Sequence, residues 1–145
     1  VDVSALGLRV EVTDLGAGNA VILDHTIPPG LIPTVPCGPT DGWKVNGSGT
    51  SEKYANVSDA LPPACLPASA LKIAKAGIKD KTAQLKGVGH KIQGKNGNFG
   101  PAVGPFRVVV VYGGAAEQAA GQCSEVTFTG AQCVLNGSGT TLTCK

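Results

Sequence analysis

Apolar and polar residues alternate along several short segments of the 145-residue chain. This period of two is typical of β-strands that bury one face. Gly and Pro, which number 21 and 10, separate these segments and favour turns. The valines at 108–111 are apolar on both faces, which predicts a central strand. The sequence predicts an all-β chain with strands within 8–14, 21–27, 71–82, 88–95, 106–112 and 124–130, and hairpins at 42–54 and 132–144.

The sequence NGSGT occurs twice, at 46–50 and at 136–140, with an offset of 90 residues. The similarity extends over GWKVNGSGTSEKY and QCVLNGSGTTLTC, which both have the pattern of a β-hairpin. Upstream, LRVEVTD at 8–14 resembles FRVVVVY at 106–112 with an offset of 98 residues. We interpret NGSGT as a turn, because a phosphate-binding loop would need a following helix and a Lys-Ser/Thr pair.

These matches predict two related antiparallel β-sandwich-like units, a first repeat at 1–62 and a second repeat at 63–145. The second repeat has two further strand-like segments, 71–82 and 88–95, before its match to the first. The first repeat has only VDVSALG in that place, so we expect it to lack an opening hairpin. Because an unpaired strand edge is a template for another strand, the neighbouring repeat, a preceding module or a second copy should complete it.

The five cysteines show no C-x-x-C spacing, which argues against a zinc or redox motif and favours disulfides formed in an oxidising compartment. Cys133 and Cys144 fall where the first repeat has Trp43 and Tyr54. We therefore expect a Cys133–Cys144 disulfide in one hairpin, and a structural aromatic pair in the other.

Sequence spacing does not determine how the remaining cysteines pair. Cys65 and Cys123 both belong to the second repeat, and we expect them to form a disulfide. Cys37, which lies in a loop of the first repeat, is then the odd cysteine.

The net charge of +2 is unevenly distributed. Residues 1–60 carry three basic and seven acidic side chains (−4), residues 61–100 carry seven lysines and one aspartate (+6), and residues 101–145 carry two of each. This pattern indicates either solvated strand faces or a basic region that contacts an acidic neighbour or an anionic polymer. The candidate contact residues are Lys72, Lys75, Lys79, Lys81, Lys86, Lys91 and Lys95.

No catalytic motif is present in the sequence. Neither His25 nor His90 has an acid or a nucleophile beside it in a recognisable arrangement. In DLGAGN, Asp14 and Asn19 offer oxygens to calcium, but a hairpin turn is the favoured interpretation. We expect a non-enzymatic protein with no catalytic, cofactor or metal site, since its glutamates are dispersed at Glu11, Glu52, Glu117 and Glu125.

The segment LPPACLPASALKIAKAGIKDKTAQLKG resembles β-rich repeats of predicted secreted bacterial proteins, in which a Lys-Asp-Lys-Thr strand leads into a Lys/Gly-rich hairpin. The endings GWKVNGSGT and GSGTTLTCK are similar in kind. This family has no established activity, so the resemblance implies extracellular β-structure alone.

We expect a secreted or cell-surface structural protein that assembles head to tail with copies of itself by strand complementation, into a fibre or a surface array. The alternative is a polysaccharide-binding or adhesin module that uses the lysines of 72–95. A small hydrolase whose acids converge only in the fold is a third hypothesis. Nucleic acid is disfavoured, since aromatic residues do not interleave with these lysines.

No apolar run approaches the ~20 residues that span a bilayer. The start at Val1 and the absence of Met indicate a processed or trimmed chain from which any secretion signal has been removed.

Overall fold

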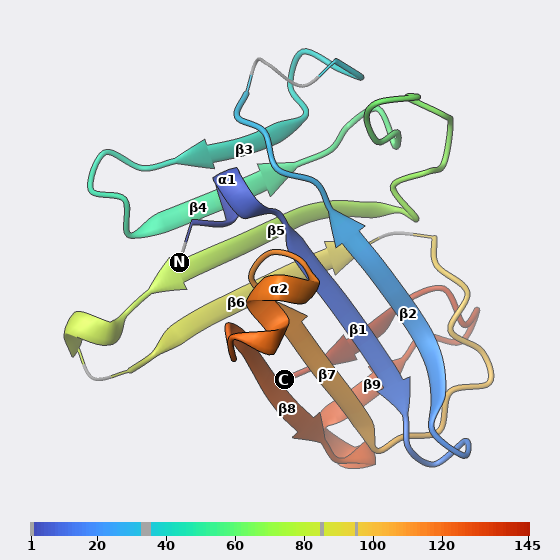
Figure 1. The fold of residues 1–145 in the computed structure, drawn as a ribbon. Helices are drawn as coiled ribbons and strands as arrows, with labels where there is room; N and C mark the ends of the chain where they lie inside the picture. Colours follow the sequence, from blue (N-terminus) through green and yellow to red (C-terminus); the bar gives the residue numbers. More distant parts are fainter. Residues whose placement is uncertain (1, 33–35, 85, 95) are drawn as a thin grey trace. The chain divides into compact units, whose positions relative to one another are not determined.

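The computed structural model describes residues 2–32, 36–84, 86–94 and 96–145. The predicted all-β class with antiparallel sheets is confirmed, and the helices are single turns (Figure 1). The strands are β1 (Leu8–Asp14), β2 (Ala20–Ile27), β3 (Gly42–Val45), β4 (Ser51–Ala55), β5 (Ile73–Asp80), β6 (Val88–Gly94), β7 (Phe106–Val111), β8 (Cys123–Phe128), β9 (Cys133–Leu135) and β10 (Leu142–Cys144). The helices are α1 (Val3–Leu6) and α2 (Ala115–Ala119), with 3-10 turns η1 (Thr82–Gln84) and η2 (Gly130–Gln132).

The chain forms two compact units, and both are discontinuous in sequence. Compact unit 1 consists of Val1–Gly7 and Ile27–Gly94, and compact unit 2 consists of Leu8–Thr26 and Lys95–Lys145. The predicted boundary between residues 62 and 63 lies inside compact unit 1, so the division differs from the prediction. The physical reason is strand pairing, because the β1–β2 hairpin leaves its own repeat to pair with β7.

Compact unit 1 contains a four-stranded sheet in the order β3-β4-β5-β6 (Figure 1). Its buried face carries Trp43 and Tyr54 from the hairpin and Ala76 and Ile78 from β5. The short helix α1 is anchored to this sheet, since the Ser4 backbone N–H donates to the buried carboxylate of Glu52 at 2.7 Å. A small apolar core of this kind is what a half-buried antiparallel sheet requires.

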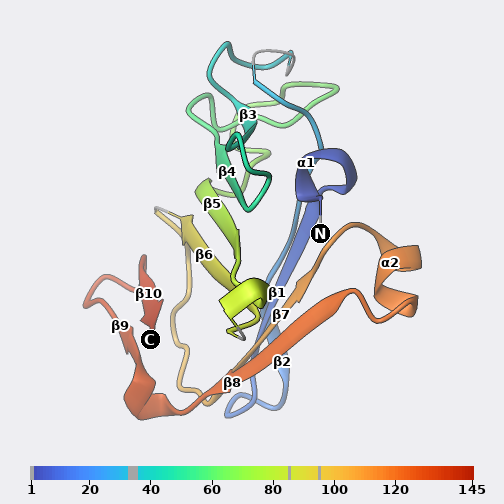
Figure 2. The ribbon, with the colours of Figure 1, turned by 90° about the vertical axis from the view of Figure 1, so that its left-hand side faces the viewer.

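Compact unit 2 contains the four-stranded sheet β2-β1-β7-β8 and the separate two-stranded sheet β9–β10 (Figure 2). The predicted central position of the valine run is confirmed, since β7 lies between β1 and β8. The two similar strands β1 and β7 pair with each other, and Glu11 lies opposite Val109, its own equivalent at an offset of 98. The strands β1 and β7 are therefore related to each other by an approximate two-fold axis within compact unit 2.

The turn between β1 and β2 is fixed by the carboxylate of Asp14, which is fully buried. It accepts the backbone N–H groups of Gly16 and Ala17 in the turn, at 3.0 and 3.2 Å. It also accepts those of Val103 and Gly104, in the loop before β7, at 2.8 and 3.1 Å. Gly16 is required here, because a Cβ atom would lie 2.1 Å from the Gly104 carbonyl oxygen. This one side chain joins two turns that are distant in sequence.

We predict that Asp14→Ala lowers the free energy of unfolding by about 3 kcal/mol or more, because it leaves buried N–H donors without an acceptor. Asp24→Asn, which changes an exposed carboxylate of the same unit, is the control and should cost about 1 kcal/mol or less. Urea denaturation of the three proteins measures the difference. Equal losses in the two variants would contradict the assigned role of Asp14.

Candidate functional site

The two NGSGT segments form the same turn. In the first, the Asn46 side-chain amide donates to Ser48 Oγ at 2.9 Å, and its carbonyl oxygen accepts the Ser51 backbone N–H at 2.9 Å. In the second, Asn136 makes the matching bonds to Ser138 Oγ at 3.0 Å and from the Thr141 backbone N–H at 2.9 Å. The second glycine of each segment has a positive φ, 67° at Gly49 and 69° at Gly139. The prediction that NGSGT is a turn is confirmed.

The hairpins that carry these turns hold equivalent pairs at equivalent positions. Trp43 lies opposite Tyr54, with ring centroids 5.3 Å apart. Cys133 lies opposite Cys144 in a disulfide, with the Cα atoms 4.1 Å apart. This short distance is typical of a pair whose backbone groups point away from the partner strand. Both predictions, the aromatic pair and the disulfide, are confirmed.

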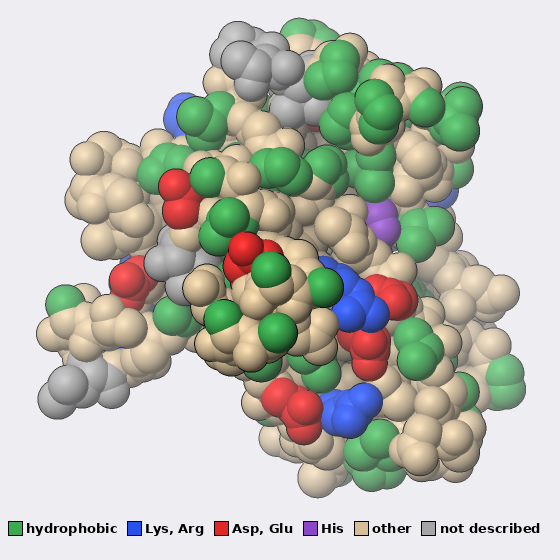
Figure 3. Space-filling view, in the orientation of Figure 1, with side chains coloured by type: hydrophobic (Ala, Val, Ile, Leu, Met, Phe, Trp, Pro, Cys, Tyr) green, Lys and Arg blue, Asp and Glu red, His purple; other side chains and the backbone are tan. Residues whose placement is uncertain are grey.

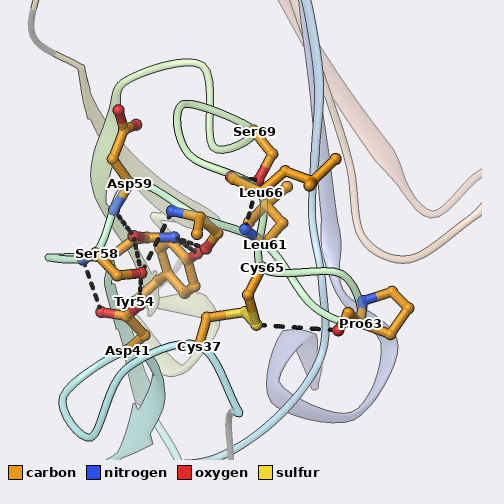
Figure 4. The surroundings of a disulfide bond; sticks show 12 residues. Cys37, Asp41, Tyr54, Ser58, Asp59, Leu61, Pro63, Cys65, Leu66 and Ser69 are labelled. Atoms are coloured by element: carbon orange, nitrogen blue, oxygen red, sulfur yellow. Dashed lines mark hydrogen bonds between the residues drawn. A yellow bond between two sulfur atoms is a disulfide. The ribbon is translucent and has the colours of Figure 1, made fainter.

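The prediction for the remaining cysteines is wrong. Cys37 and Cys65 form the second disulfide, with Cα atoms 5.1 Å apart (Figure 4). Cys123 is free and exposed at the start of β8. Cys65 and Cys123 belong to different compact units, whereas Cys37 and Cys65 lie in two loops of compact unit 1. The odd cysteine is therefore Cys123 and not Cys37.

Buried polar side chains bring these two loops together. Asp41, in the loop of Cys37, accepts the Val57 backbone N–H at 2.7 Å and the Ser58 hydroxyl (Figure 4). Asn56 is also buried, and its amide donates to the Tyr54 hydroxyl at 2.8 Å and to the Ala60 carbonyl at 2.9 Å. The loop after β4 is thus folded back by hydrogen bonds to the first hairpin.

The two hairpins differ in what lies beside them. β4 pairs with β5, so the hairpin β5–β6 completes the sheet begun by β3–β4. The hairpin β5–β6, which the sequence predicts as the opening of the second repeat, therefore completes the sheet of the first repeat. In the part of the chain that the structure describes, the equivalent hairpin β9–β10 is a sheet of two strands. Among the described residues no strand pairs with β10 beyond β9, and beside it the Gly97 N–H donates to the Thr140 carbonyl at 3.1 Å.

The predicted lysine strip divides into three parts. Lys75, Lys79 and Lys91 are exposed on strands β5 and β6. Lys72 forms an ion pair with Asp59, so its charge is compensated. Lys81 follows β5, Lys86 lies in the loop between β5 and β6, and Lys95 is outside the described residues.

Two further exposed lysines join this region through the sheet. Lys44 on β3 lies opposite Lys53 on β4, and Lys53 lies opposite Gly77 on β5. Sequence reasoning missed them because they belong to the acidic first sixty residues. The sequence did contain a signal for them. Lys44 and Lys53 are next to the buried Trp43 and Tyr54 in sequence, and neighbouring residues on a strand point to opposite faces of the sheet.

The acidic side chains have structural contacts. Glu52 accepts from Ser4, and Glu117 accepts the Gly114 backbone N–H at 2.8 Å beside α2. Glu11 forms ion pairs with Arg9 and Arg107 at 3.1 and 3.6 Å. Figure 3 shows such acidic and basic side chains next to one another over the sheet of compact unit 2. Glu125 is exposed on β8.

The surroundings of Asp24, His25 and His90 lower the pKa values of these three side chains. A hydrogen bond from the Arg9 guanidinium, at 2.8 Å, lowers the pKa of Asp24. Burial lowers the pKa of the adjacent His25, against a smaller raising effect of Asp24. Burial likewise lowers the pKa of His90. Both imidazoles are therefore neutral at pH 7.

The described residues contain no cluster of three or more His, Cys, Asp and Glu side chains that could hold a metal ion. At the predicted calcium alternative, the Asp14 oxygens already accept four backbone N–H groups. Among the described residues, no helix has the length and apolar character needed to cross a membrane.

No protein-family model matches the chain, and no curated protein or solved structure is significantly similar to it. The resemblance to repeats of secreted bacterial proteins therefore stays a prediction.

We predict that digestion of the native protein without reduction yields the linked pairs Cys37–Cys65 and Cys133–Cys144, and that alkylation labels Cys123 alone. Mass spectrometry after alkylation with iodoacetamide identifies all three. A Cys65–Cys123 peptide would contradict the structure.

The burial of His25 predicts how stability depends on pH. The folded pKa of His25 lies below the value of about 6.5 of an unfolded chain, so the unfolded state binds more protons between the two values. The free energy of unfolding should therefore fall as the pH drops below about 6.5. Chemical denaturation at pH 7.5 and at pH 5.5 measures this change. His25→Gln should reduce the change in the free energy of unfolding between these two pH values. An equal change in the variant and the wild type would contradict the role assigned to His25.

Proposed function

We propose that this chain is a secreted, non-enzymatic structural protein whose repeats complete one another's sheets, and that neighbouring copies join head to tail by adding a strand to β10. The observation that carries the proposal is the pairing of β4 with β5, compared with the two-stranded sheet of β9–β10. One copy of the repeated hairpin receives a covering hairpin from the next repeat. In the second copy the Thr140 carbonyl already accepts the Gly97 N–H at 3.1 Å, so the edge offered to a neighbour consists of Leu142 and Cys144.

The backbone of β10 supports this role. Asn136 N–H donates to the Thr141 carbonyl and Lys145 N–H donates to the Gln132 carbonyl, both at 3.0 Å. Because antiparallel pairs alternate, the N–H and C=O groups of Leu142 and Cys144 point away from β9. The equivalent groups of the first hairpin, at Glu52 and Tyr54, face β5.

The strand that fits β10 resembles β5. Glu52 lies opposite Ile78 and Tyr54 lies opposite Ala76. An offset of 90 residues carries these positions to Leu142 and Cys144. A neighbouring copy that supplies such a strand makes a head-to-tail contact, which propagates and does not close. The two disulfides support an oxidising, extracellular location.

We predict that Leu142→Pro abolishes assembly, because proline removes the outward N–H of β10 and spares the bonds to β9. Leu135→Pro is the matched control, since Leu135 lies opposite Leu142 and its N–H points to the other edge of the same hairpin. Light scattering after gel filtration and negative-stain microscopy, over a range of concentrations, should show oligomers or fibres for the wild type and the control only.

Intact Cys133–Cys144 disulfides in both variants confirm that the hairpin still folds. A wild-type protein that stays a monodisperse monomer at high concentration would overturn the proposal, as would equal assembly of the two variants.

A further inference from the structure

One face of the sheet of compact unit 1 is covered with lysines. Lys44, Lys53, Gly77 and Lys91 form a row across β3, β4, β5 and β6, each opposite the next. Because side chains two residues apart share a face, Lys75 and Lys79 lie on the same side as Gly77. All of these lysines are exposed. We call this set the lysine face: Lys44, Lys53, Lys75, Lys79 and Lys91.

Lys81 adds its charge to the same face. Gly89 lies opposite Lys79, so a side chain at Gly89 would point to this side of the sheet. The Lys81 ammonium lies 3.8 Å from the position that a Cβ atom on Gly89 would take. The ammonium group therefore covers Gly89 on the lysine face.

No carboxylate compensates these charges on the strands. The other strand positions that share the face are Gly42, Ser51, Ala55, Gly77, Gly89 and Gln93. Lysines directly opposite each other, as at Lys44 and Lys53, destabilise a sheet. The sheet of compact unit 2 differs, because there Arg9 and Arg107 form ion pairs with acids. The lysine face thus keeps an unfavourable arrangement that a bound anion would relieve.

Gly77 leaves a low point at the centre of the face. It does not have a positive φ, and an added Cβ would come no closer than 3.9 Å to another atom, the Glu52 carbonyl oxygen. Neither backbone conformation nor packing therefore requires glycine, although glycine weakens the interior of a strand. The position is flanked by Lys53 and Lys91 across the sheet and by Lys75 and Lys79 along β5. Such a glycine is expected where a ligand approaches the backbone closely.

We propose that the lysine face binds a linear acidic polysaccharide, which crosses the strands over Gly77 and places its anionic groups between Lys53 and Lys91. These two lysines are two strand spacings apart, about 10 Å. This separation is comparable with the length of a disaccharide, so a polymer with one acid per disaccharide would contact both.

The chemistry of the face favours a polysaccharide over other polyanions. Its strand positions carry no aromatic side chain on which the bases of a single-stranded nucleic acid could stack. They carry no large apolar side chain that could insert into a lipid surface. The two disulfides fit an oxidising compartment, where acidic polysaccharides are accessible.

Binding of the full chain to immobilised polygalacturonate tests the proposal, with neutral dextran as the polymer control. We expect binding that weakens as salt increases, and none to dextran. Lys53→Gln combined with Lys91→Gln should weaken binding about tenfold or more. Lys86→Gln, which removes one charge from the loop between β5 and β6, is the charge control and should change affinity by less than about threefold.

Gly77→Val is the decisive variant, because it leaves every charge in place, its Cβ atom meets no other atom closer than 3.9 Å, and valine suits a strand. It should weaken binding about fivefold or more if the polymer lies over Gly77. Wild-type affinity in this variant would overturn the proposed path. Wild-type affinity in the double lysine variant, or equal binding to dextran, would overturn the site.

Two further probes distinguish the class of polyanion. Duplex DNA and phosphatidylglycerol vesicles should bind more weakly than polygalacturonate at the same salt concentration. Tighter binding of either would overturn the assignment to a polysaccharide.

Discussion

The structure depends on the pairing of strands that belong to different copies of the repeat. A hairpin alone leaves backbone groups unpaired and buries little apolar surface, so it is marginal in water. In this chain β1 pairs with β7, and β4 pairs with β5. These two interactions build both four-stranded sheets. They also make each compact unit discontinuous in sequence.

The two copies of the hairpin are stabilised in different ways. The first packs Trp43 on Tyr54 and is covered at its edge by β5–β6. The second has a disulfide at the same two positions and, in the described residues, a sheet of its own. A covalent link restricts the unfolded chain and compensates for contacts that a two-stranded sheet does not make. The same hairpin backbone is therefore part of a four-stranded sheet in one repeat and a candidate strand acceptor in the other.

The sheets of the two compact units also differ in how their charged side chains are arranged. On the sheet of compact unit 2, arginines and acids are paired at short distances. On the sheet of compact unit 1, the lysines of four adjacent strands face one side without an acid between them. Alternation creates both surfaces, since it places the core on one face and the charges on the other. A surface of one sign attracts a polyanion, whereas a paired surface mainly stabilises its own sheet.

The sequence by itself determined the features that depend on local pattern. Alternation defined the strands, and the Asn-Gly turns set the register that places Cys133 opposite Cys144. Tertiary structure decided what alternation and turns do not encode, namely which strand lies beside which and which loops meet. The Cys37–Cys65 disulfide and the capture of β5–β6 by the first repeat both arise from such long-range contacts. Lys44 and Lys53 join the lysine face for the same reason, because pairing brings distant segments to one side of a sheet.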